Sequence, residues 1–398
     1  MLSRIAQSGP PPFDRRFAPT HAMEVRHGGL ANLAGGAPFS FTRASVALAA
    51  DSSGVLRQYA VDQPRFVVSP VGIMSVLREP QRTNKCTNYN AVPNGSLTNL
   101  SKGGDAAATL TEVDDSAALA AAGLSTVCSS GKVFKLDNSS GVAIAYVDAY
   151  GATGNTNDHT LSAYMRGSGT AYLRTGFTLA NDWGPATLTS SYARIVSRQS
   201  SGLAGGSKNS ADVLRVVAHP GSVVYFILNQ LEEGQHETSP IVVAGASATR
   251  SRDSVFIPNF VITAGEPTWQ MIDFVMPYQV LGSNRLTGTS SIGLEIVPGS
   301  RVARVYNGTA LLATANAYTA GTRGKVAYAG DSTGRSICLN GGTVAFDANT
   351  HINAGLTNYT LLQFTTTDDA SSPMGYLHGF YRGTQRPTNA QLQALTTL

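Results

Sequence analysis

The sequence is poor in charged residues and in cysteine, and both shortages exclude classes of protein. Asp, Glu, Lys and Arg make up 14% of the 398 residues, whereas hydrophobic residues make up 42%. Such a chain has ample apolar surface to bury, which argues against extensive disorder. The three cysteines, Cys86, Cys128 and Cys338, lack the spacing of a zinc site and are odd in number. Neither a disulfide framework nor a zinc site is predicted, and assembly in a reducing cytoplasm fits.

Long apolar runs and sequence repeats are also missing. The longest apolar helical stretch, 117–127, would span roughly 16 Å at about 1.5 Å per residue, which is about half of a bilayer core. Residues 1–12 contain three prolines but no apolar central region, so neither a secretory signal peptide nor membrane insertion is predicted. No fixed repeat of about 20–50 residues recurs, which argues against a propeller or a solenoid.

The positive charge is small and scattered. The net charge is +4 and the sequence pI is 8.9, but the densest basic groups are only Arg15-Arg16 and Arg250-Ser251-Arg252. This pattern is typical of a solvated surface, so no nucleic-acid partner is predicted.

What the chain does contain is abundant Gly, Ser, Thr and Asn around short runs rich in Val, Ile, Tyr and Phe. This composition predicts an all-β protein of strands joined by tight turns. At roughly 100–200 residues per domain, the length predicts at least two cores. We expect an N-terminal extended arm over 1–40, a small β module over 41–85, and two antiparallel, jelly-roll-type β-sandwiches in series over 86–250 and 251–398.

The arm is predicted from its prolines, which exclude a regular helix or a central strand. We expect it to dock on another subunit, with a disordered tail as the alternative. The strands are predicted from alternation and turn signals. They comprise 55–61, 65–68, 142–147, 160–165, 170–177, 193–197, 213–218, 223–228, 269–275, 291–297, 301–306, 324–329, 336–339, 343–346 and 361–364.

An ordered set of short motifs lies in the first quarter of the chain. It consists of FTRAS at 41–45, Gly54, PRF at 64–66 and LREPQRTN at 77–84. This set resembles a module that recurs in predicted phage tail-fibre and head-fibre proteins. The sequence departs from the usual glycine-leucine pattern between Gly72 and Leu77.

Two later segments carry further resemblances. Residues 225–250 are similar to the closing strand of jelly-roll, carbohydrate-binding-like domains of phage fibre proteins. Residues 375–395 resemble the final strand and short helix of laminin-G or concanavalin-like sandwiches, with Thr388 or Asn389 as the helix cap. The resemblance implies a virion fibre or spike, homotrimeric, assembled in the bacterial cytoplasm. Its N-terminal arm would attach to a capsid, neck or tail protein.

Candidate carbohydrate-binding residues are aromatic side chains near polar groups, because a ring face suits the C–H surface of a sugar. Trp183 in the loop-like segment with Asn181 and Asp182 fits this description, with a partly buried tryptophan as the alternative. Tyr318 and Tyr359, near polar turns, are further candidates. By contrast, Trp269 lies in an apolar run beside Met271 and Phe274 and is predicted to belong to the core.

No cofactor is required by the sequence, although a structural calcium ion could be held by an oxygen-rich loop. Asp148, Asn157 and Asp158 are the candidate ligands, with ordinary turn residues as the alternative. The histidines show no HxH or HExxH spacing, which gives metal catalysis no support.

Catalytic residues are not predicted. The segment 330–334 (GDSTG) matches the esterase pattern G-x-S-x-G, but strand-like sequence on both sides favours a hairpin turn over a nucleophile elbow. A depolymerase would need two convergent carboxylates, and adjacent acidic residues on a strand point to opposite faces. We therefore predict a non-enzymatic fibre that binds host surface glycan. The alternatives are a purely structural capsid or neck decoration protein and, third, a polysaccharide depolymerase.

Overall fold

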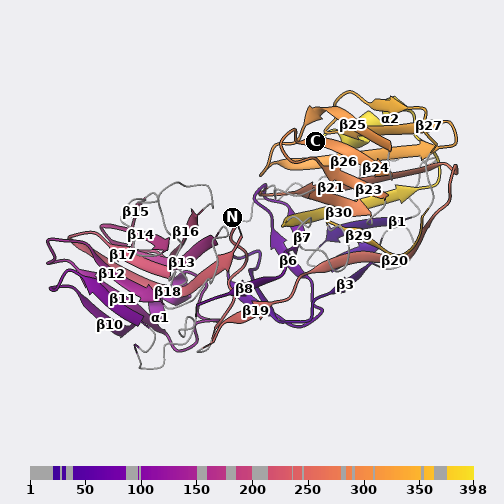
Figure 1. The fold of residues 1–398 in the computed structure, drawn as a ribbon. Coiled ribbons are helices and arrows are strands. Elements are labelled where there is room, and N and C mark those ends of the chain that lie inside the picture. Colours follow the sequence, from indigo (N-terminus) through magenta and orange to yellow (C-terminus); the bar gives the residue numbers. More distant parts are fainter. Residues whose placement is uncertain are drawn as a thin grey trace, which may run out of the picture. The chain divides into compact units, whose positions relative to one another are not determined.

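The computed structural model shows two compact units, both built almost entirely of antiparallel β-sheet (Figure 1). Unit 1 comprises Met1–Arg43, Asp62–Pro80 and Arg252–Leu398, and unit 2 comprises Ala44–Val61 and Gln81–Ser251. The structure describes residues 21–26, 29–32, 39–86, 97, 100–149, 159–175, 185–199, 214–234, 236–243, 246–278, 284–288, 292–307, 310–350, 354–362 and 374–398.

Unit 2 is a β-sandwich, which confirms the predicted fold class for this part of the chain. One sheet has the order β10 (Thr109–Asp114), β11 (Lys132–Asn138), β18 (Ser222–Glu233), β13 (His159–Ser168) and β16 (Ala193–Gln199). The other has the order β15 (Ala186–Thr187), β14 (Thr170–Thr175), β17 (Leu214–Ala218), β12 (Ala145–Ala149) and β9 (Leu100–Gly104). Alternate residues of both sheets, such as Phe134, Leu161, Val216 and Phe226, form the core between them.

The outer face of the first sheet is covered by a helix and a hairpin. Helix α1 (Ser116–Ala121) buries Leu119 there, and the hairpin of β4 (Ala47–Ala50) and β5 (Leu56–Tyr59) adds Leu48 and Leu56. The helix does not extend through the whole apolar stretch 117–127 because Gly123 adopts a left-handed conformation, with φ of 70°. That conformation ends a helix readily, since glycine has no Cβ to clash.

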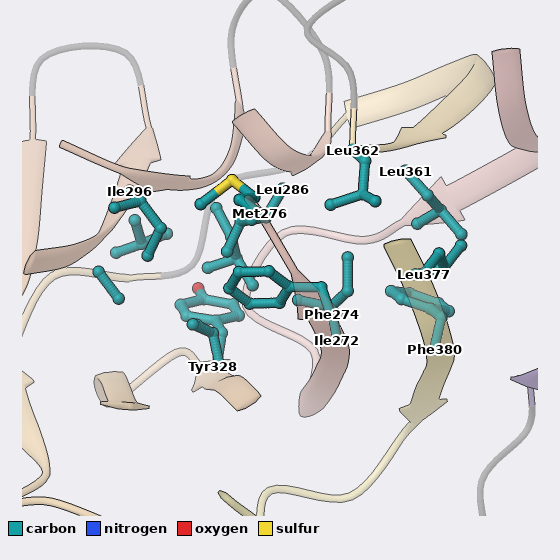
Figure 2. Close-up of a cluster of buried hydrophobic side chains, with 14 of the residues drawn as sticks. Ile272, Phe274, Met276, Leu286, Ile296, Tyr328, Leu361, Leu362, Leu377 and Phe380 are labelled. Atoms are coloured by element: carbon teal, nitrogen blue, oxygen red, sulfur yellow. The ribbon is translucent and has the colours of Figure 1, made fainter. Parts of the chain in front are cut away.

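Unit 1 is also a sandwich. Its larger sheet runs β2 (Gly29–Asn32), β1 (His21–Arg26), β30 (Gly375–Gly383), β21 (Thr268–Val275), β26 (Arg323–Asp331), β27 (Gly334–Leu339) and β28 (Ala345–Asp347), and β7 (Met74–Arg78) joins β6 (Arg65–Val68) to β30. The facing sheet runs β25 (Ala310–Ala317), β24 (Val302–Asn307), β23 (Ile292–Ile296), β22 (Asn284–Gly288), β29 (Ala354–Leu361), β20 (Ser254–Ile262) and β3 (Ser40–Thr42). Apolar side chains between the sheets, among them Ile272, Phe274, Leu286 and Phe380, form its core (Figure 2).

Helix α2 (Asn389–Thr396) covers part of the outer face of the larger sheet. Its cap is Thr388, whose side chain accepts a hydrogen bond from the Gln391 backbone in a capping box, as the sequence predicted. Leu392 packs against Met271 and Trp269, which is fully buried as predicted. No helix among the described residues is long and apolar enough to cross a membrane.

The predicted arm and small module are not separate bodies. Strands β1 and β2 lie within the predicted arm and extend the larger sheet of unit 1. The predicted module is divided, because β3, β6 and β7 belong to unit 1 whereas β4, β5 and β8 (Arg82–Asn84) belong to unit 2, where β8 pairs with β19 (Ala248–Arg250). Turn signals show where strands end, but they do not show which distant strand each one will pair with.

The segment 330–334 forms the predicted hairpin turn between β26 and β27, where Asp331 pairs with Gly334. The Asp331 carboxylate accepts hydrogen bonds from Thr333 and from Arg386. A second strand follows the serine, so the strand-turn-helix context of a nucleophile elbow is not formed here.

Candidate functional site

The second sheet of unit 2 carries a polar outer face. Along β12, β14 and β17, side chains such as Val147, Leu173 and Val216 point into the core, so the residues between them lie on the opposite face. We call this opposite surface the arginine face. Its members are Ser101, Gly103, Tyr146, Asp148, Tyr172, Arg174, Arg215 and Val217, with His219 directly after β17. Asp148, Tyr172, Arg174, Arg215 and Val217 are buried.

A row of polar residues crosses four strands of the arginine face. Arg174 on β14 lies directly opposite Arg215 on β17, and Arg215 lies opposite Asp148 on β12, which is opposite Ser101 on β9. Arg215 donates two hydrogen bonds to Asp148, from Nε at 2.5 Å and from Nη2 at 2.7 Å. The row therefore holds two guanidinium groups and one carboxylate, and like charges directly opposite each other are destabilising.

Tyr146, in the next row of the arginine face, contacts the Arg215 side chain. The guanidinium carbon of Arg215 lies 3.7 Å from the centroid of the Tyr146 ring, a cation–π contact. Tyr146 in turn lies against Gly103, where an added Cβ would come within 2.4 Å of the ring. The absence of a side chain at Gly103 thus lets the ring lie close to β9 and hold Arg215 in place.

Two polar groups of this face have nitrogen atoms without partners. Arg174 is only 4% exposed, and its Nε has no hydrogen-bond partner in the described part of the chain. The Nε2 atom of His219 is likewise buried and unpaired among the described residues, and its ring lies 5.5 Å from that of Tyr172. Native proteins rarely leave buried polar atoms unpaired, because desolvation without a partner costs roughly 1–3 kcal/mol.

The polar row lies near one end of its sheet. Asp148 and Arg174 each stand one residue before the end of their strands, and Arg215 stands one residue after the start of β17. The chain continues from these strand ends into 150–158, 176–184 and 200–213. The predicted site residues Asn157, Asp158, Asn181, Asp182 and Trp183 belong to these stretches and lie outside the described residues.

Asp148, a predicted calcium ligand, has another role in the structure. Both of its carboxylate oxygens face Arg215, so it serves as an ion-pair partner on the arginine face. Among the residues that the structure describes, no group of three or more His, Cys, Asp or Glu side chains is arranged to hold a metal ion.

Tyr318 and Tyr359 are core residues, which corrects the expectation that their rings are presented near polar turns. Tyr318 is 1% exposed, and its hydroxyl donates to the Thr322 carbonyl at 2.7 Å. Tyr359 is fully buried and stacks on Phe260, with ring centroids 4.2 Å apart. Neither ring has a free face for a sugar.

The motifs at 41–84 supply buried structural groups. In unit 1, Arg65 pairs with both Glu79 and Asp253, and Arg43 also pairs with Asp253 at 3.1 Å. All four side chains are fully buried, and the Arg78 Nε donates to the Asp253 carbonyl. Burial alone would lower the pKa of Arg65, but the charges of Asp253 and Glu79 outweigh it and raise that pKa. We call these five residues the buried ion cluster.

The last motif residue, Asn84, has an equivalent role in unit 2. Its side-chain amide donates to the carbonyls of Asn229 and Ile241, and its oxygen accepts from the backbone of Cys86 and Leu231. One buried side chain thus satisfies four backbone groups of the sandwich.

A Ser-His-Asp arrangement, which sequence reasoning missed, lies in unit 1. The His378 Nε2 is 3.2 Å from the Ser69 Oγ, and its Nδ1 is 3.1 Å from an Asp273 oxygen. Asp273 also accepts two hydrogen bonds from Arg323, and the Ser69 Oγ accepts one from the Ile73 backbone. These contacts tie the turn after β6 to the larger sheet, since Asp273 and His378 lie on its strands β21 and β30.

Acid should weaken this arrangement through Asp273. Burial opposes the charged carboxylate, but hydrogen bonds from Arg323 and His378 outweigh it and lower the pKa of Asp273. A depressed folded-state pKa gives stability above the unfolded value, about 3.9, that is lost as the pH falls further. The difference in unfolding free energy between wild type and Asp273→Asn should therefore shrink below about pH 4. Urea unfolding from pH 7 to pH 3 measures it, and a constant difference would contradict this assignment.

The sequence matches no known protein family and no curated protein. Domain 4 of AbnA, a GH43 extracellular arabinanase from Geobacillus stearothermophilus in complex with arabinotriose, is 13% identical with a TM-score of 0.30, over 41% of this chain and 84% of that one. The CBM40 of the Ruminococcus gnavus IT-sialidase bound to α2,3-sialyllactose is also 13% identical with a TM-score of 0.30, over 35% of this chain and 96% of that one.

A third similar structure is the heptameric SAP-like pentraxin from Limulus polyphemus, which is 10% identical with a TM-score of 0.27 over 35% of this chain and 74% of that one. Scores and identities this low carry no argument about function. The fold of this chain rests on its own strands and their pairing.

Proposed function

We propose that this protein is a non-enzymatic virion fibre or spike protein that binds host surface carbohydrate through the arginine face of unit 2. The observation that carries the proposal is the polar row on the sheet, where Arg174, Arg215 and Asp148 lie side by side. Sugar sites need a few fixed polar groups on a rigid support. Strand pairing and the contact between Arg215 and Tyr146 provide that support.

The virion role rests on the resemblance of the segments 41–84 and 225–250 to phage fibre proteins, and the segment 375–395, which resembles laminin-G or concanavalin-like sandwiches, follows them in the order expected for phage adhesins. In such a particle the chain would be a homotrimer attached through its N-terminal part to a capsid, neck or tail protein. Several weak sugar sites on one particle would then combine through effective concentration into firm attachment. A decoration protein would keep both sandwiches and bind no glycan.

A glycan array with the full chain tests this function, with release of reducing ends followed in parallel. Saturable binding without release is the expected result. The absence of any binding by a folded protein would favour decoration, and release of reducing ends would overturn the non-enzymatic assignment.

Gly103→Ala is expected to weaken glycan binding while leaving the core intact. The new Cβ would displace the Tyr146 ring, and Arg215 would lose a cation–π contact that contributes roughly 0.5–2 kcal/mol. We expect affinity to fall about threefold to tenfold. Tyr146→Ala is the matched variant: combining the two changes should cause no further loss, because both act through the same ring. Additive losses would show that Gly103 acts elsewhere.

Hydrolysis at Ser69 is a second candidate function, favoured by the distances from His378 to Ser69 and to Asp273. A catalytic aspartate serves to orient the histidine, whereas Asp273 is shared with Arg323. A serine nucleophile cleaves acyl bonds and not glycosidic bonds, so an esterase assay with an acetylated oligosaccharide tests this candidate. Acetate release that disappears in Ser69→Ala would support it, and no release by the folded protein would contradict it.

A further inference from the structure

We propose that the arginine face selects acidic glycans, with Arg174 as the residue that binds the carboxylate of the sugar. This inference rests on the proposed function and names the class of glycan. Its starting point is the charge of the polar row, which has two arginines and a single carboxylate.

The two arginines differ in what they already bind. Arg215 is engaged by Asp148 through two hydrogen bonds and lies on the Tyr146 ring. Arg174 is directly opposite Arg215, is 4% exposed, and has a shielded Nε with no partner within the described residues. The one carboxylate in the row is therefore used by Arg215, and the charge of Arg174 is the excess.

An anionic ligand would complete this arrangement. A guanidinium presents a planar set of donors that matches the two oxygens of a carboxylate. In a shielded site such a charge-assisted pair is stronger than in water, and a bound anion would also offset the repulsion between Arg174 and Arg215.

Sugar recognition has further partners on the same face. His219 follows β17 directly, its Nε2 is buried and unpaired among the described residues, and its ring lies 5.5 Å from that of Tyr172 on β14. An imidazole can hydrogen-bond hydroxyl groups. An acidic sugar fits this combination of one excess cation and neutral polar groups.

The stability of the unliganded protein gives an independent readout. A structural arginine would stabilise the sheet, so its removal would lower Tm. A ligand-binding arginine held opposite a like charge costs stability, as functional groups often do. Arg174→Met is therefore expected to raise the Tm of the unliganded protein. A lower Tm would overturn the assignment of Arg174 as a binding residue.

The binding experiment compares an acidic oligosaccharide with its carboxyl-reduced form, using the full chain. Wild type should bind the acidic form about 10- to 100-fold more tightly, and Arg174→Gln should lose that preference while binding the neutral form unchanged. Arg57→Gln, which removes an exposed arginine of the same unit, is the control and should leave both affinities unchanged. A sulfated oligosaccharide shows whether the site takes any anion or a carboxylate alone.

The outcomes separate this inference from the proposed function. Equal binding of the acidic and reduced forms by wild type, unaffected by Arg174→Gln, would overturn the acidic selectivity and leave carbohydrate binding standing. Binding of the sulfated and not the carboxylated sugar would overturn the carboxylate assignment. No binding to any glycan by the folded protein would overturn both.

Discussion

Replacing Arg65 with methionine is expected to destabilise unit 1 by about 3–5 kcal/mol. The Arg65 guanidinium pairs with both Glu79 and Asp253, and all three side chains have no solvent exposure. Methionine removes the cation but leaves two carboxylates buried beside Arg43 and Arg78, so part of their charge loses its partner. Urea unfolding followed by Trp269 fluorescence measures the effect in a Trp183→Phe background.

Two control variants distinguish the loss of the buried ion cluster from a general effect of removing a positive charge. Arg301→Met changes an exposed arginine of the same unit and should leave unfolding unchanged. Arg65→Lys keeps a charge but lacks the planar fork that reaches two carboxylates, so an intermediate loss is expected. If Arg65→Met cost no more than Arg301→Met, the buried ion cluster would not stabilise unit 1.

Replacing Asn84 with leucine is expected to destabilise unit 2 by roughly 3–4 kcal/mol. The side chain is fully buried and serves two carbonyls and two backbone N–H groups. Leucine is similar in volume and offers none of these hydrogen bonds, so all four backbone groups lose their partner. Hydrogen exchange should show faster exchange in β18, where the Leu231 N–H donates to the Asn84 side chain, and in β8, which contains Asn84.

Asn84→Asp distinguishes the two halves of this network. Aspartate retains an acceptor for the N–H groups of Cys86 and Leu231 but loses the donors to Asn229 and Ile241. It would also bury a charge, so its destabilisation should grow as the pH rises above its pKa. Thr83→Val, which removes one hydroxyl contact with Thr249 at a half-buried neighbour in the same strand, is the control and should cost about 1 kcal/mol or less. Protection unchanged in Asn84→Leu would contradict the structural role.

The strands were predictable because their local patterns are strong. The predicted 65–68 matches β6 at both ends, and 269–275 matches β21 to within one residue. The prediction 361–364 was displaced: β29 ends at Leu361, and 363–364 lie outside the described residues. Alternation locates a strand from its own residues, whereas pairing between distant strands depends on packing that no local pattern encodes. The division of 41–85 between the two units illustrates this limit.

The candidate site depends even more on strand pairing, and so less of it could be predicted from local patterns. Arg174 and Arg215 each occupy one charged position in an otherwise largely apolar strand, a signal that alternation could have revealed. That the two lie opposite each other follows only from the pairing of β14 with β17. Aromatic residues near polar turns proved a poor guide, since Tyr318 and Tyr359 are buried in the core. Arg43 and Arg65 were recognised as members of the motifs FTRAS and PRF. That both are buried and paired with carboxylates could not be predicted from those motifs.

A crystal structure of the full chain with the acidic glycan that binds best on the array tests the central claim most directly. We predict sugar density on the arginine face, with its carboxylate paired to Arg174 and hydroxyl groups within hydrogen-bond distance of His219 or Tyr172. Sugar bound only to unit 1, or bound to unit 2 away from β12, β14 and β17, would contradict the claim.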